Sequence, residues 1–150
     1  MTRAFYVEVG ETAEFAKTLT ESDVAMFCAI SGDFDPIHVD EERAHRTVFG
    51  RRIAHGVLSM ALLSTVSAMI SKRAVDRGSQ GVSVSMGYDR IRFLKPVFIG
   101  DTLTARYTIQ AIDPVKSRSH SKVEVRNQHG ELVVVGEHLM KWLPSTQVLV

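Results

Sequence analysis

Cysteine is almost absent from this sequence of 150 residues. The single cysteine, Cys28, cannot form an internal disulfide and stands in the apolar run "VAMFCAI". A lone thiol among apolar neighbours is typical of a buried cysteine in a reducing compartment. It is a poor candidate for a nucleophile, because that role needs the thiolate, which apolar surroundings disfavour. We therefore expect neither a disulfide-stabilised fold nor cysteine catalysis.

An excess of charge of either sign is also missing. The 18 Lys and Arg residues against 17 Asp and Glu residues give a formal net charge of +1. No overall field draws nucleic acid or an anionic membrane to the chain, so an anionic ligand must meet a local basic patch. The content of 45% hydrophobic and 23% charged residues is that of an ordinary folded globular protein.

Leader patterns, long hydrophobic runs and linkers are absent as well. Segment 1–15 has no continuous apolar core and carries Glu8 and Glu11, which argues against a signal or transit peptide and favours the cytoplasm. The most apolar segment, 57–70, is too short to cross a bilayer. No repeat or low-complexity tract divides the chain, so we expect a single domain over residues 1–150.

Three helices are expected from capping residues and apolar spacing. Thr20, Glu21, Ser22 and Asp23 are candidate caps for a short helix that ends near Gly32, and Asp40 is a candidate cap for a helix over 41–46. Residues 54–75 are apolar on nearly every face, which predicts a long helix enclosed by other elements.

Antiparallel strands are expected to enclose that helix. Apolar and polar residues alternate over 102–111, which is the period of a half-buried strand. Three more segments have strand character: 81–94, 118–127 and 132–143. Gly87 is a candidate bulge, the turn "NQHG" joins the last two strands, and a short edge strand is expected within "ETAEFAKTLT". The pattern predicts an α+β domain whose sheet curls round the long helix.

The stretch "SGDFDPIHVDEERA" gathers several acids beside one histidine, His38. A metal site is not expected, because no second His or Cys cluster completes a ligand set and the spacing of a calcium loop fails. A phosphoryl-transfer role for Asp33 and Asp35 would need a buried parallel strand before them. General acid–base catalysis by Asp33 and His38 needs no cofactor, and Pro36 stiffens the loop. These residues alone also fit a second interpretation, in which the stretch is a solvated helix-capping loop with an exposed histidine.

This stretch, followed by "FGRRIAHGVLSMALLS", resembles the hydratase motif of the MaoC-like (R)-specific enoyl-CoA hydratases and 3-hydroxyacyl-thioester dehydratases. "YDRIRFLKPVFIGDTLTARYTI" resembles the strand segment that follows in that family. The resemblance implies a hotdog fold and a homodimer with its site in a tunnel near the dimer interface. It also implies a substrate carried by coenzyme A or acyl carrier protein, and a reaction without a cofactor.

The resemblance also implies roles for single residues. Asp33 and His38 would bind the water that adds to a 2-enoyl thioester, giving the (R)-3-hydroxyacyl product, and would act in the reverse dehydration. The N–H of Gly56, at the start of the long helix, would bind the thioester carbonyl, although a glycine needed only for a tight helix start stays open. Ser64 would orient Asp33, unless it bonds to its own helix backbone. Asp35 stands where many members carry asparagine, and its role stays open.

The remaining polar residues give weaker predictions. We expect a structural role for His55 and surface or strand positions for the other histidines, which are His45, His120, His129 and His138. Candidate partners for coenzyme A phosphates are Arg51, Arg52, Lys72, Arg73, Arg90, Arg92 and Lys95. Two alternatives to the hydratase remain, namely an acyl-thioesterase of the same fold and a non-catalytic acyl-thioester-binding subunit.

Overall fold

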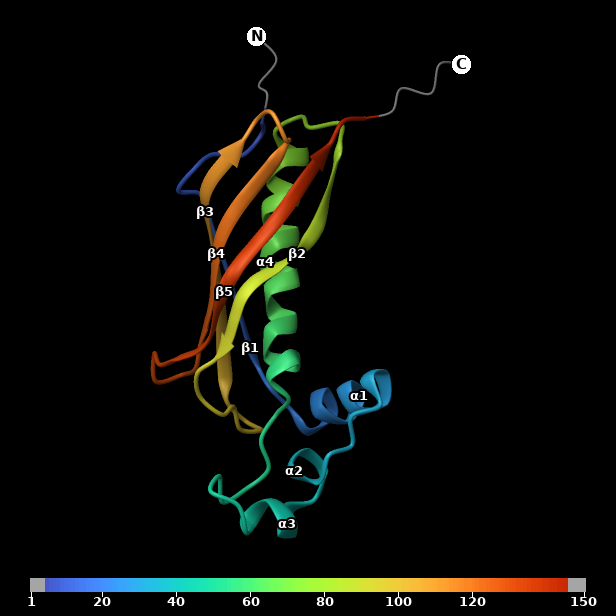
Figure 1. Ribbon diagram of the computed structural model, residues 1–150, viewed down its shortest axis with the longest axis vertical. Coiled ribbons are helices and arrows are strands. Elements are labelled where there is room, and N and C mark those ends of the chain that lie inside the picture. Colours follow the sequence, from blue (N-terminus) through green and yellow to red (C-terminus); the bar gives the residue numbers. More distant parts are fainter. Residues whose placement is uncertain (1–4, 146–150) are drawn as a thin grey trace.

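The computed structural model describes residues 5–145, so both ends of the predicted single domain lie outside the described residues. Its elements are β1 (Thr12–Thr18), α1 (Glu21–Ser31), α2 (Pro36–Val39), α3 (Glu41–His45), α4 (Gly56–Asp76), β2 (Val82–Phe93), β3 (Thr102–Asp113), β4 (Arg118–Arg126) and β5 (Leu132–Leu143). A curved sheet lies along α4, and the three short helices lie near the start of α4, beyond the end of the sheet (Figure 1). The predicted α+β architecture is confirmed.

The sheet has the strand order β1-β3-β4-β5-β2, and every neighbouring pair is antiparallel. All the strands predicted from the sequence are present, with β1 at one edge and β2 at the other. The register of β2 against β5 shifts between Ser85 and Gly87, where Gly87 has φ of 132°, so the predicted bulge is confirmed. The "NQHG" turn joins β4 to β5, and the Gly130 N–H donates to the Asn127 carbonyl at 3.0 Å.

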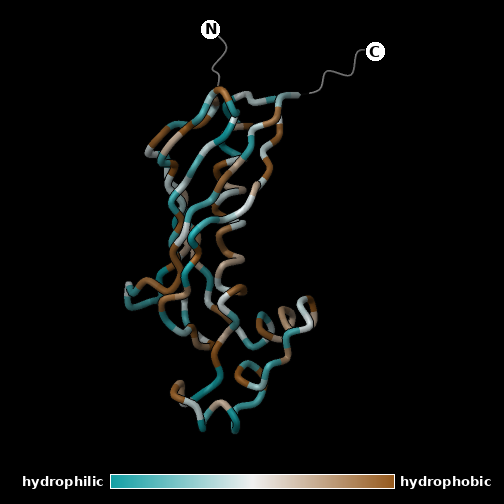
Figure 2. The backbone as a smooth tube through the Cα atoms, viewed as in Figure 1, coloured by the Kyte–Doolittle hydropathy of each residue, from teal (hydrophilic) through white to brown (hydrophobic). Residues whose placement is uncertain are grey.

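The main core lies between β3 and α4. Alternate residues of β3 are fully buried: Leu103, Ala105, Tyr107 and Ile109. Leu63, Val66 and Ile70 of α4 are equally buried and belong to the same cluster. Hydrophobic and hydrophilic positions alternate along the strands in Figure 2, as the pleat requires when one face is covered.

The sheet covers only one side of α4. Exposed positions recur at helical spacing along the other side: Val57, Ala61, Ser64, Ala68, Lys72 and Val75. The predicted arrangement, a long central helix with a curved antiparallel sheet around it, is confirmed, and within the single chain one side of the helix stays exposed. No helix within residues 5–145 is long and apolar enough to span a bilayer.

The helices begin where the capping residues predicted. The Thr20 side chain accepts a hydrogen bond from the Asp23 N–H, and the Asp23 carboxylate accepts one from the Thr20 N–H, so α1 starts with a capping box. Asp40 caps α3. The sequence did not predict α2, which is four residues long, because Pro36 at its first position reads equally well as a loop residue.

A polar cluster surrounds the buried His138 of β5. Its Nδ1 lies 2.8 Å from the Tyr107 hydroxyl, its Nε2 lies 2.7 Å from the Ser85 hydroxyl, and its ring stacks on Tyr88. Burial lowers the pKa of His138 to about 4, and burial raises the pKa of Tyr107 to about 12. The sequence predicted a surface or a strand position for His138. The structure places it on a strand, where it is fully buried.

Candidate active site

The loop between α1 and α2 holds the Asp33 carboxylate by short-range hydrogen bonds. Gly32 ends α1 in the left-handed conformation, with φ of 78°, and donates its N–H to the Cys28 carbonyl. The Ser31 hydroxyl then accepts the Asp33 N–H at 3.1 Å, and Asp33 Oδ1 accepts the Asp35 N–H at 3.1 Å. The carboxylate is half exposed, so one oxygen is fixed by the loop while the group still meets solvent.

Asp35 acts as a helix cap in this structure. Its carboxylate accepts the Ile37 N–H at 2.9 Å and so begins α2, with Pro36 next to it at the first helical position. Helix capping alone therefore explains an aspartate at this position, without a role in catalysis. It also places His38 on α2, one helical turn after the loop that carries Asp33.

His38 is held by the backbone of a distant segment. Its Nδ1 lies 2.7 Å from the Ile53 carbonyl oxygen. A carbonyl can only accept, so Nδ1 carries the proton and Nε2 of the neutral ring has a free lone pair. Ligand atoms of Asp33, His38 and His55 lie within 4.8 Å of one another. The structure therefore brings the predicted pair together.

His55 is a third member of this group, which the sequence did not predict. Its side chain is 3% exposed, and its ring stacks on His38 with centroids 3.7 Å apart. Its Nε2 lies 3.1 Å from the Asp33 carbonyl oxygen and 3.8 Å from Asp33 Oδ2. The only signal in the sequence was its position just before Gly56 in the motif. Its contacts connect both members of the pair.

A divalent ion at Asp33, His38 and His55 would need an unprotonated ring nitrogen from each histidine, and the two rings stack at an interplanar angle of 28°. His38 Nδ1 and His55 Nε2 each face a backbone carbonyl and so carry protons. The arrangement suits acid–base chemistry on water better than metal binding.

Gly56 is the first residue of α4, at the positive end of the helix dipole. Its N–H has no hydrogen-bond partner within residues 5–145. A Cβ added at Gly56 would lie 2.9 Å from the ring of Phe93, so only glycine fits under this ring. The close contact with Phe93 gives a structural reason for glycine at this position, and the binding of the thioester carbonyl by its N–H stays a prediction.

Ser64 is not brought to Asp33 by any hydrogen bond in the described part of the chain. It lies on the exposed side of α4, and its carbonyl accepts the Ser67 hydroxyl at 2.9 Å. Its predicted orienting role stays a prediction.

A cavity of about 330 Å³ lies at the start of α4. Its walls are mostly apolar and include Phe49, Ile53, Gly56, Phe93, Val97 and Val134. Asp33 and His38 do not line it, but the two sites share one wall. Ile53 and Gly56 border the cavity, while the Ile53 carbonyl holds His38 and the intervening His55 contacts Asp33.

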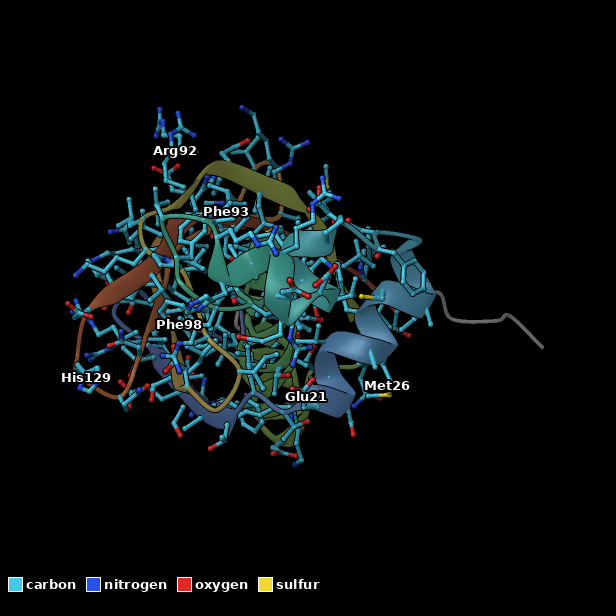
Figure 3. All side chains as sticks on the ribbon, turned by 90° about the horizontal axis from the view of Figure 1, so that it is seen from below. Glu21, Met26, Arg92, Phe93, Phe98 and His129 are labelled. Atoms are coloured by element: carbon cyan, nitrogen blue, oxygen red, sulfur yellow. The ribbon has the colours of Figure 1, made fainter. Side chains whose placement is uncertain are left out.

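The candidate phosphate-binding cations divide into two groups. Five have an acidic side chain within ion-pair distance: Arg52, Lys72, Arg73, Arg90 and Lys95. Arg51, which stacks 4.0 Å over the Phe98 ring, and Arg92 have no acidic partner among residues 5–145. Arg92 extends away from the molecule beside Phe93, far from Glu21 of α1 (Figure 3). These two cations are the ones free to meet an anion.

Comparison with known proteins identifies relatives over most of the chain. A family model described as a MaoC like domain matches residues 5–131. An (R)-specific enoyl-CoA hydratase of Aeromonas caviae is 34% identical over 135 residues, covering 90% of this chain and 95% of the relative. An enzyme of the same name from Rhodospirillum rubrum is 40% identical over 110 residues, or 73% and 71% of the two chains.

A dehydratase and two solved structures extend this set. The 3-hydroxybutyryl-CoA dehydratase of Methylorubrum extorquens is 34% identical over 90% of this chain and 80% of its own length. The unliganded R-hydratase of Pseudomonas aeruginosa has a TM-score of 0.79 at 35% identity, covering 95% of this chain and 87% of that chain. The (R)-hydratase of Aeromonas caviae has a TM-score of 0.78 at 34% identity, covering 92% and 98%.

Proposed function

This chain belongs to the MaoC-like dehydratase family, and on that premise we propose that it hydrates trans-2-enoyl thioesters to (R)-3-hydroxyacyl thioesters and catalyses the reverse dehydration. The observation that carries the proposal is the proximity of Asp33 and His38, whose acid–base atoms lie within 4.8 Å. Relatives named as hydratases and dehydratases support the same reaction.

In the proposed mechanism, Asp33 and His38 hold one water molecule between them. The lone pair on His38 Nε2 accepts a proton from this water as its oxygen forms a bond to C3 of the enoyl group. The pair then returns a proton to C2, so that the elements of water are added and nothing is oxidised or reduced. The Ile53 carbonyl and the Asp33 loop fix both groups before substrate arrives, which lowers the cost of orientation.

Negative charge gathers on the thioester oxygen while C3 is attacked. The free N–H of Gly56 at the start of α4 is the donor that we assign to this oxygen. The acyl chain then enters the apolar cavity that Gly56 and Phe93 border. The carrier of the acyl group is coenzyme A or acyl carrier protein, and the unpaired Arg51 and Arg92 are candidates to meet its phosphates.

An assay with crotonyl-CoA distinguishes this reaction from the alternatives. Loss of the conjugated thioester absorbance without release of free thiol, together with an (R)-3-hydroxybutyryl product, is the expected result. Release of thiol without hydration would instead identify a thioesterase. Inertness toward enoyl thioesters of several chain lengths would identify a binding subunit.

We also propose that the protein forms a homodimer through β2. This strand lies at the sheet edge, and several of its apolar side chains are exposed: Val82, Val84, Met86 and Phe93. An exposed apolar edge offers unpaired backbone groups to another strand, and a second copy of β2 meets them with the same apolar surface. The cytoplasmic location stays a prediction from the sequence.

A further inference from the structure

Arg51 carries a positive charge that no acidic side chain neutralises. The residue is exposed, and within residues 5–145 it has neither an ion-pair partner nor a hydrogen-bond partner. Its guanidinium carbon lies 4.0 Å over the centroid of the Phe98 ring. This contact holds the guanidinium in place and leaves its N–H donors without a hydrogen-bond partner. Arg51 therefore presents a restrained cation with unused donors.

Arg51 lies at the rim of the cavity at the start of α4. Phe98 forms an isolated antiparallel bridge with Ile53, so the backbone that follows Arg51 runs beside Phe98. Ile53 and Val97, the residue before Phe98, both line the cavity. Arg51 stands five residues before Gly56, so their Cα atoms are at most about 18 Å apart. The cation is therefore next to both chain segments that form this part of the wall.

The charged groups near this rim leave the charge of Arg51 unopposed. Lys95, which lines the cavity, is paired with Glu131. Asp101 follows Phe98 by three residues, but its carboxylate is buried and accepts the Phe98 N–H at 2.9 Å. It forms no ion pair with Arg51 in the described part of the chain. An anion that reaches this rim thus finds Arg51 available.

The carriers of acyl thioesters share one anionic group. In coenzyme A and in acyl carrier protein alike, the pantetheine arm that begins at the thioester sulfur ends in a phosphate. We propose that Arg51 binds this phosphate through the N–H groups of its guanidinium, whose planar fork matches phosphate oxygens in pairs. This proposal rests on the proposed function, because it assumes that the thioester oxygen meets the Gly56 N–H and that the arm leaves the cavity past Arg51.

Arg92 is the less suitable of the two cations without an acidic partner. Its guanidinium donates to the neighbouring Ile91 carbonyl at 2.8 Å, and no aromatic ring among residues 5–145 stacks with it. A phosphate there would have to order a long side chain at a cost in rotamer entropy, whereas Phe98 already restrains Arg51. Because Arg51 is exposed, we expect a gain of about fivefold in affinity, which falls as salt screens the charges.

Binding of saturated thioesters tests this without requiring turnover. Titration calorimetry at low ionic strength compares butyryl-pantetheine, butyryl-phosphopantetheine and butyryl-CoA for the wild type, Arg51→Gln, Arg51→Lys and Arg46→Gln. Arg46→Gln is the matched control, because it removes the same charge from an exposed arginine that pairs with Glu42. We expect the wild type and Arg46→Gln to bind both phosphorylated thioesters about fivefold more tightly than butyryl-pantetheine. Arg51→Gln should lose this preference, and Arg51→Lys should keep part of it.

Four results would overturn the proposal. They are an unchanged preference in Arg51→Gln, no preference in the wild type, equal weakening of all three thioesters in Arg51→Gln, and a preference for butyryl-CoA alone, which would place the contact on the nucleotide. Tighter binding of butyryl-CoA than of butyryl-phosphopantetheine, with both weakened in Arg51→Gln, would support the role of Arg51 and identify coenzyme A as the carrier.

Failure of the proposed reaction can be told apart from failure of this proposal. Absence of crotonyl-CoA hydration beside a preserved phosphate preference would count against the reaction and not against the role of Arg51. Failure of all three butyryl thioesters to bind would count against both.

Discussion

In each of two histidines of the site, one backbone carbonyl determines which ring nitrogen carries the proton. The Ile53 carbonyl accepts from His38 Nδ1, and the Asp33 carbonyl accepts from His55 Nε2. The first contact leaves His38 Nε2 free to act on water, and the second fixes the loop that carries the Asp33 carboxylate. His55 is therefore expected to act through its two neighbours, without contact to substrate.

Substitution of His55 tests this positioning role. His55→Leu removes both the bond to the Asp33 carbonyl and the stack on His38, and we expect kcat to fall about tenfold with little change in KM. His55→Gln keeps an N–H near the same carbonyl and should recover part of the rate. Steady-state kinetics with crotonyl-CoA measure the split between kcat and KM. Equal kcat values for His55→Leu, His55→Gln and the wild type would refute the positioning role of His55.

Gly56→Ala tests the close contact at the start of α4. The new Cβ would lie 2.9 Å from the Phe93 ring, so we expect the variant to lose about 1–3 kcal/mol of unfolding free energy and most of its activity. Phe93→Leu in the same chain opens the space and should restore part of both. Urea denaturation and initial rates follow the two variants. Unchanged stability in Gly56→Ala would show that the ring moves aside freely.

At the scale of elements, Arg52 connects the helices around the candidate site. Its guanidinium pairs with Glu21 of α1 and with Glu41 of α3, which lie on either side of the Asp33 loop. Arg52→Met should lower stability by less than about 1 kcal/mol, because the pairs are near the surface, and should raise hydrogen exchange over residues 21–45. Unchanged hydrogen exchange over residues 21–45 in Arg52→Met would show that the hydrogen bonds within the Asp33 loop are enough to hold it.

The helices also show what could be predicted from the sequence. Capping residues located α1 and α3, and the apolar run located α4, because these signals are local. The position of Asp33 beside His38 followed from the motif. The contacts of His55 could not be predicted, since they depend on long-range contacts between α4 and the Asp33 loop.

At the scale of the whole molecule, the buried His138 makes stability depend on pH. The pKa of His138 is lowered from 6.5 to about 4 in the folded protein by burial, so between these values the unfolded chain binds more protons. Stability therefore falls as pH falls from 6.5 to 4, by about 3 kcal/mol from this residue, and its contribution is constant below that. Urea denaturation across this range should show a shallower decline in His138→Gln. Parallel curves for the two proteins would contradict the assignment.

The β2 edge is the second property of the whole molecule that can be measured. Sedimentation should give a dimer for the wild type, and Val84→Lys should shift it toward monomer by placing a charge on the exposed edge. Ala16→Lys, which adds the same charge on the exposed part of β1 at the opposite edge, is the control and should remain dimeric. A monomeric wild type, or a dimer insensitive to Val84→Lys, would exclude this interface.

The most direct test of the account is the turnover number for crotonyl-CoA in Asp33→Asn and His38→Gln. His45→Gln is the matched control, because His45 is an exposed histidine on the neighbouring α3 whose Nδ1 lies 2.9 Å from the Gly50 carbonyl oxygen. We expect each variant of the pair to fold normally and to lose about 10²–10⁴-fold in kcat, while His45→Gln keeps the wild-type rate. A folded Asp33→Asn or His38→Gln protein that still forms the (R)-alcohol at the wild-type rate would contradict the proposed roles of Asp33 and His38.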